Sequence, residues 1–286
     1  MEIFRALGTL VEPPVEEHRC VADLLELGSP PGASTYSEVF LFQLYPYASV
    51  YLGPEGMLGG DARDRIAGFW RVLDETPPRE CDHLALMLSL YARLCELREN
   101  ADDDKTEAFW SHARRAFFWE HMASWLPVFL NKLEQIADDY YGRWGRLLRQ
   151  VIVAEAESLT AQETLSLHLR EAPAFEDPRE RGGETFLESL LVPVRSGMIL
   201  VRSDLERAAG ELELGRRVGE RKFVLKALLA QDADATFEWL EGEAVGWEGL
   251  HRARVATFEA IFDFWAERAA RTAELLATLR DESLRA

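Results

Sequence analysis

Three polar side chains that could take part in chemistry, Glu80, Asp82 and His83, lie close together in the sequence, directly after a Pro-Pro pair. The prolines predict the start of a helix, because their fixed φ angle suits a first helical turn, where the missing N–H donor costs nothing. Carboxylates in or near that turn lie at the positive end of the helix dipole. The apolar run over residues 84–94 then predicts a buried helix over residues 80–98.

The spacing of these residues limits the chemistry they can do. Asp82 and His83 are adjacent, and only residues three or four apart share a helical face, so the two cannot form a proton-relay pair within the helix. His83 is expected on the same face as Met87 and Leu90. It is either a half-buried histidine that bonds to a backbone carbonyl or to a carboxylate of another helix, or part of a polar patch at the mouth of a groove.

Motifs of the common enzyme classes are missing. The sequence contains no G-x-x-x-x-G-K-[ST], no H-E-x-x-H and no G-x-S-x-G, so it lacks the usual phosphate loop, zinc-ligand pair and nucleophile elbow. Its three cysteines form no C-x-x-C pair, which predicts neither a zinc site nor a disulfide framework. We therefore expect no enzyme activity, no cofactor and no bound metal. One alternative stays open, an enzyme or nucleotide hydrolase in which Asp82 and His83 serve as base and orienting residue.

Composition and charge limit the class of protein. Of the 286 residues, 48% are hydrophobic, which is enough for a packed core. The formal net charge of -18 argues against nucleic-acid binding, which needs a basic surface. It favours cationic partners, or serves only solubility. The N-terminus has too short an apolar stretch for a secretory signal or a membrane span, so we expect a cytoplasmic protein without membrane insertion.

Apolar residues recur with helical periodicity along almost the whole chain, which predicts an all-α protein. The strand-like run over residues 198–201 has no partner strand in the sequence. We expect an N-terminal arm or first helix over residues 1–35, a helical core over 36–170, a linker or crossover over 171–183, and a C-terminal helical segment over 184–286. Helices are expected over residues 36–51, 61–73, 80–98, 106–123, 128–156, 184–195, 202–214, 220–230 and 234–243, with a single long helix over 247–280. Its apolar stripe consists of Val255, Phe258, Phe262, Trp265 and Ala269.

Three short motifs follow one another in a distinctive order. They are Tyr-Pro-Tyr-Ala-Ser-Val-Tyr over residues 45–51, Glu-Cys-Asp-His-Leu over residues 80–84, and His-x-x-x-Trp-Leu-Pro-Val-Phe over residues 121–129. In order and spacing they resemble the TorD/DmsD/NarJ-like family of redox-enzyme maturation chaperones, over residues 36–160. The resemblance implies a compact TorD-like helical bundle, to which this chain adds a C-terminal helical segment beyond the usual family length.

The resemblance also implies a site. In the family, the acidic-x-Asp-His-Leu element borders the surface that recognises the leader peptide of the client, and it falls here on Glu80, Asp82, His83 and Leu84. The first motif adds Tyr47, Ser49 and Tyr51, and the third adds Trp125, next to His121, Pro127 and Phe129. The aromatic residues among them are expected in the core more than in contact with a client.

The implied function is that of a cytoplasmic chaperone. It would bind the precursor of a molybdenum-cofactor oxidoreductase, in particular its twin-arginine leader peptide, and assist cofactor insertion and assembly before export. Such a leader presents two adjacent guanidiniums and then an apolar segment, so we expect Glu80 and Asp82 to hold the arginines. The alternative is a helical assembly or structural subunit of a redox complex that acts through the long C-terminal helix. The identity of the client, recognition of the leader or of the enzyme body, and a monomeric or homodimeric state stay open.

Overall fold

The structure, a computed structural model, describes all residues except 138, 161–163, 254–257 and 284–286. Over this part of the chain the secondary structure is helical and no β-strand forms, so the all-α prediction is confirmed and residues 198–201 form no strand. An isolated antiparallel bridge joins Tyr47 to His83. No helix in the described part is long and apolar enough to cross a membrane. The chain divides into two units, which are described one at a time.

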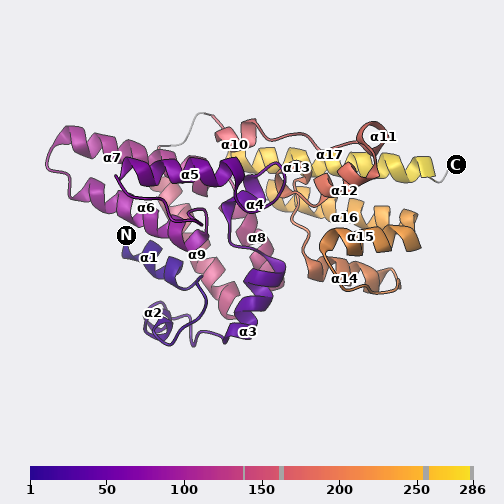
Figure 1. Cartoon of the computed structure of the whole chain (residues 1–286), viewed down its shortest axis with the longest axis horizontal. Coiled ribbons are helices and arrows are strands. Elements are labelled where there is room, and N and C mark those ends of the chain that lie inside the picture. Colours follow the sequence, from indigo (N-terminus) through magenta and orange to yellow (C-terminus); the bar gives the residue numbers. More distant parts are fainter. Residues whose placement is uncertain (138, 161–163, 254–257, 284–286) are drawn as a thin grey trace. The chain divides into compact units, whose positions relative to one another are not determined.

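Unit 1 contains Met1–Gly53 and Met57–Arg170. Within it, α1 packs on α6 and α9, α6 packs on α7, and α8 packs on α9 (Figure 1). Buried aromatic side chains such as Phe40, Tyr91, Phe117 and Trp144 fill the space between these helices. The elements are α1 (Glu2–Thr9), α2 (His18–Leu24), α3 (Ala33–Tyr36), the π-helix η1 (Ser37–Gln43), α4 (Ala48–Leu52), α5 (Gly60–Val72), α6 (Leu84–Glu99), α7 (Asp104–Phe117), the π-helix η2 (Phe118–Met122), α8 (Leu126–Ile136), α9 (Tyr140–Ser158) and α10 (Leu167–Arg170).

Two long helices expected in unit 1 are interrupted. The helix expected over residues 36–51 breaks after η1, and α4 begins only at Ala48. The helix expected over residues 128–156 ends at Ile136 and restarts at Tyr140. Gly142 permits the second break, because a Cβ atom there would overlap the carbonyl oxygen of Ala137. The chain between α8 and α9 can therefore pass close to the first turn of α9 only at a glycine.

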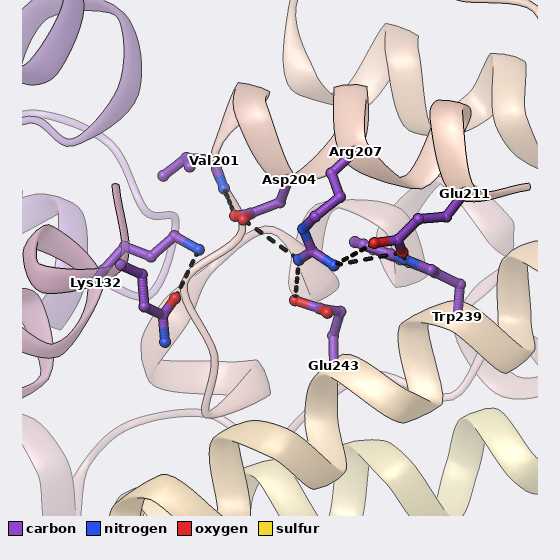
Figure 2. A network of polar contacts seen from close by, with 8 residues as sticks. Lys132, Val201, Asp204, Arg207, Glu211, Trp239 and Glu243 are labelled. Atoms are coloured by element: carbon purple, nitrogen blue, oxygen red, sulfur yellow. Dashed lines mark hydrogen bonds and ion pairs between the residues drawn. The ribbon is translucent and has the colours of Figure 1, made fainter. Parts of the chain in front are cut away.

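Unit 2 contains Pro54–Gly56 and Glu171–Ala286. Within this unit, Arg195 Nε donates a hydrogen bond of 2.7 Å to the carbonyl oxygen of Pro54 in the short segment. Arg207 of α14 forms ion pairs with Asp204 and Glu211 of the same helix, and its ion pair with Glu243 joins α14 to α16, as Figure 2 shows. The elements are α11 (Pro178–Arg181), α12 (Gly183–Leu190), α13 (Pro193–Ser196), α14 (Arg202–Glu211), α15 (Arg221–Gln231), α16 (Ala233–Arg252) and α17 (Glu259–Ser283).

The prediction of a single long helix over residues 247–280 is wrong. Residues 247–252 end α16, and α17 begins at Glu259 and runs back along α16 as a helical hairpin. An ion pair of 2.7 Å between Arg280 and Glu241 fixes the antiparallel register. Phe258, Phe262, Trp265 and Ala269 of the expected stripe are buried in unit 2, whereas Val255 lies outside the described residues. The stripe is therefore part of the core of this unit.

Candidate functional site

The expected site is built where α4 and α6 begin. Tyr47 is the N-cap residue of α4 and His83 is the N-cap residue of α6. The two helix starts are paired by backbone hydrogen bonds, from Ala48 N–H to the Asp82 carbonyl (3.0 Å) and from Leu84 N–H to the Pro46 carbonyl (2.8 Å). The first and second sequence motifs thus come together, although about thirty residues separate them.

His83 has a role that sequence spacing did not predict. Its Nδ1 accepts a hydrogen bond of 3.2 Å from the N–H of Ala85, which satisfies one of the free donors at a helix start. The helix begins at Leu84 instead of Glu80, so Glu80 and Asp82 lie in the turn before it. Burial lowers the pKa of His83, and the nearby Glu80 and Asp82 carboxylates oppose that shift. A neutral ring is the form that can accept the Ala85 hydrogen bond.

Asp82 is a buried structural carboxylate. Its side chain accepts hydrogen bonds from the hydroxyl (2.5 Å) and the backbone N–H (3.3 Å) of Ser49, and only 2% of the residue is exposed. The same Ser49 hydroxyl accepts a hydrogen bond of 3.0 Å from the N–H of Gly59, the N-cap residue of α5. One serine–aspartate pair therefore ties the starts of α4, α5 and α6 together.

Three of the expected site residues remain accessible at the surface. The Tyr47 hydroxyl donates a hydrogen bond of 3.0 Å to Glu80, which is exposed, and the Tyr47 ring meets the His83 ring edge-on at a centroid distance of 4.8 Å. Burial, and then the Glu80 hydrogen bond, raise the pKa of Tyr47. Tyr47 therefore keeps its proton at neutral pH and can act as a donor to a carboxylate. We call Tyr47, Glu80 and His83 the recognition face.

The other expected site residues support this face from the core. Leu84, Tyr51 and Trp125 are buried, and the Tyr51 and Trp125 rings stack at 5.1 Å with an interplanar angle of 11°. The Tyr51 hydroxyl donates a hydrogen bond of 2.7 Å to the Tyr45 carbonyl. Aromatic pairs of this kind stabilise a core beyond the area they bury. Tyr51 and Trp125 lie in the core as expected, whereas Tyr47, expected there as well, is only half-buried.

A cavity of about 210 Å³ opens beside the recognition face. It brings in residues that the sequence did not single out, because they come from the glycine-rich loop before α5, from α5 itself and from the turn before α6. Among them, Arg63 forms an ion pair with Asp64, and Arg79 is exposed next to Glu80. The cavity is lined by Tyr47, Leu58, Gly59, Arg63, Arg79, Glu80 and Asp82.

The groups around the cavity include a carboxylate and apolar surface. Glu80 offers an exposed carboxylate, Tyr47 and Leu58 offer apolar surface, and none of the cavity residues is a cysteine, serine or threonine. Asp82 and His83 use their polar atoms to hold helix starts together. Within the described ranges, no group of three or more His, Cys, Asp or Glu side chains is placed to hold a metal ion.

The region that contains the site is similar to known proteins. The family model of the nitrate reductase delta subunit matches residues 25–131, which include every expected site residue. A chaperone protein TorD from Shewanella pealeana is 24% identical over 181 residues, which make up 56% of this chain and 77% of that protein. This chain has a TorD-like region. The resemblance seen in the three sequence motifs is thereby confirmed.

Two further relatives delimit the TorD-like region. The chaperone proteins TorD from Vibrio parahaemolyticus and from Vibrio vulnificus are 29% and 26% identical over 113 residues. These matches cover 36% and 37% of this chain and 52% and 51% of the respective relatives. The chain thus spans about half the length of these two proteins. Since the family model ends at residue 131, it covers no part of the long segment 171–286 of unit 2.

Proposed function

We propose that this chain is a maturation chaperone that binds the precursor of a molybdenum-cofactor oxidoreductase through its twin-arginine leader peptide, and assists assembly before export. The observation that supports this most is the recognition face, which lies in the TorD-like region and presents the Glu80 carboxylate beside apolar surface and a cavity. The relatives are named chaperone protein TorD, which agrees with this role. The cytoplasm is the compartment in which such a precursor is met.

The roles of the individual residues follow from their accessibility. Glu80 receives a leader guanidinium, since its carboxylate is exposed and oriented by the Tyr47 hydroxyl. The half-buried rings of Tyr47 and His83 provide surface against which the guanidinium plane or the next apolar residue can pack. Asp82 does not contact the leader in this proposal, because its carboxylate is buried and bound to Ser49. It supports the face indirectly by fixing the turn that carries Glu80.

Arg79 provides a second test of the charge of the ligand, and its replacement should have the opposite effect to that of replacing Glu80. Its side chain is exposed in the same cavity as Glu80, and its positive charge repels a cationic leader while it attracts an anionic ligand such as a nucleotide. Replacement of Arg79 by glutamine therefore strengthens leader binding if the ligand is cationic. The same replacement weakens binding if the cavity accepts an anion.

The proposal is tested by the affinity of a synthetic peptide with two adjacent arginines and an apolar segment, measured by fluorescence anisotropy at several salt concentrations. An exposed ion pair contributes up to about 1 kcal/mol, so Glu80→Gln should weaken binding about fivefold and reduce its salt dependence. Arg79→Gln should strengthen binding. Glu75→Gln is the matched control, because Glu75 is an exposed carboxylate in the same stretch of sequence and does not line the cavity.

Either of two results would contradict the proposal. One is an affinity that stays the same in Glu80→Gln, and the other is weaker binding in Arg79→Gln. The alternative role as an assembly subunit depended on a free apolar stripe in the C-terminal helix. The described members of that stripe are buried within unit 2, so this alternative has lost the feature that favoured it.

A further inference from the structure

The chain carries adjacent arginines of its own. The sequence contains two Arg-Arg pairs, at residues 114–115 and 216–217. Arg114 of the first pair is part-buried in α7, where it forms an ion pair with Glu155 and lies over the Tyr91 ring. Arg216 and Arg217 are both exposed, in the connection between α14 and α15. Only the second pair is thus presented to a partner.

The segment over residues 215–223, here called the arginine loop, is held in a defined conformation. The Gln231 side chain exchanges two hydrogen bonds with the backbone of Gly215, accepting one of 2.7 Å and donating one of 3.1 Å. At the other end, Arg221 donates a hydrogen bond of 2.6 Å to the Leu200 carbonyl. A loop anchored at both ends loses less conformational entropy on binding than a free segment would.

Arg221 and Lys222 of the arginine loop are engaged within unit 2, Arg221 by its hydrogen bond to Leu200 and Lys222 by ion pairs with Glu184 and Glu188. The charges of Arg216 and Arg217 are not used in this way. Arg216 and Arg217 form no ion pair or hydrogen bond with any residue that the structure describes, whereas Arg207 in the preceding helix is paired with three carboxylates (Figure 2). The apolar residues that follow are also exposed, 87% for Val218 and 54% for Phe223. The two guanidiniums and these apolar side chains all stay exposed, so together they form a surface that a partner can bind.

This surface shares with the proposed client two adjacent guanidiniums and nearby exposed apolar side chains, of which Val218 follows directly and Phe223 comes after three charged residues. Resting on that proposed function, we propose that the arginine loop is a self-ligand, which binds the recognition face of a second copy of the chain and must be displaced by the client. Charge complementarity supports a second copy as the partner. The chain has a net charge of -18, so two copies repel one another except where cationic side chains such as Arg216 and Arg217 meet an exposed carboxylate.

Self-association without any client is the direct test. Sedimentation velocity of the full chain should show a concentration-dependent dimer at low salt (about 0.05 M) that dissociates at high salt (about 0.5 M). The variant Arg216→Gln/Arg217→Gln should raise the dimer dissociation constant about tenfold or more, and Glu80→Gln should raise it about fivefold. Arg181→Gln/Arg271→Gln is the matched control, because it removes two exposed charges from the same unit and should leave the dimer unchanged.

Mixing the two kinds of variant tests whether the loop binds the recognition face. Glu80→Gln keeps an intact loop and Arg216→Gln/Arg217→Gln keeps an intact face, so an equimolar mixture should form more dimer than either variant alone. Wild-type chain that remains monomeric at low salt, or a mixture that forms no more dimer than its components, would overturn the self-ligand. Self-association that resists high salt would overturn it as well.

Leader binding then separates this inference from the proposed function. In dilute solution, where dimers are absent, Arg216→Gln/Arg217→Gln should bind the peptide as the wild-type chain does. In concentrated solution its apparent affinity for the peptide should exceed that of the wild-type chain, because self-association no longer competes with the peptide. The ratio of the two affinities should match the loss of self-association. Peptide binding without any self-association would overturn the self-ligand and leave the proposed function intact. No peptide binding in any variant would overturn the proposed function itself.

Discussion

Replacing Ser49 by alanine tests whether Asp82 is a structural carboxylate. The hydroxyl of Ser49 donates to Asp82 over 2.5 Å and accepts from the Gly59 N–H over 3.0 Å, and Asp82 is almost completely buried. A hydrogen bond to a charged group contributes about 1.5–3 kcal/mol and a neutral one about 0.5–1.5 kcal/mol. The variant should therefore lower the free energy of unfolding of unit 1 by about 2–4 kcal/mol, since the Asp82 carboxylate keeps only the Ser49 backbone donor.

Urea unfolding monitored by circular dichroism and tryptophan fluorescence measures this loss, with separate transitions fitted for the two units. Ser34→Ala is the matched control, because Ser34 is exposed and its replacement should change stability by less than about 0.5 kcal/mol. The double variant Ser49→Ala/Asp82→Asn should be more stable than the sum of the single effects predicts, because it removes the buried charge that lost its donor. A Ser49→Ala variant as stable as the control would refute the structural role of Asp82.

Two further predictions concern stability. Gly197→Ala should destabilise unit 2 by more than about 3 kcal/mol in thermal or urea unfolding, because Gly197 has φ +76° and the Cβ of an alanine there would lie 2.7 Å from the Trp265 carbonyl oxygen. The control is Gly246→Ala, which has open space around it and should be neutral or stabilising. Equal effects of the two variants on stability would contradict this reasoning. Burial, and then the charge of His168, lower the pKa of His121 to about 3, so the unfolded chain binds a proton there at about pH 6.5 and the folded chain does not. Stability should therefore fall as the pH drops below 6.5, by about 2–3 kcal/mol from this residue at pH 4.5, and His121→Phe should flatten the measured dependence of unfolding free energy on pH; an unchanged slope would show that His121 titrates normally in the fold.

Sequence periodicity predicted the helical class, but it could not locate every break. The interruption between α8 and α9 contains no proline, and the glycine that permits it lies inside the next helix, at Gly142. The end of α16 is rich in helix-forming residues, so periodicity indicated one helix over residues 247–280. The hairpin is decided instead by tertiary burial, because both helices contribute aromatic side chains around His251.

The candidate site shows the same limit of sequence reasoning. Order and spacing of the motifs singled out both Ser49 and Asp82, but the hydrogen bond between them is a long-range contact that no local pattern encodes. The sequence therefore does not show which motif residues support the site and which are exposed to contact a ligand, and the structure is needed to tell them apart. Glu80 and Asp82 are the two acidic residues of one motif, yet Glu80 is exposed and Asp82 is buried.

This division has a consequence for binding. A buried Ser49–Asp82 pair ties three helix starts together, so the turn that carries Glu80 is fixed before any ligand arrives. A pre-organised carboxylate loses little conformational entropy on binding, which makes a single exposed ion pair worth more than it would be on a mobile loop. The strongly negative chain additionally increases the rate at which cationic segments arrive. Salt should therefore slow association with the client more than it changes dissociation, and stopped-flow kinetics with the leader peptide can separate the two.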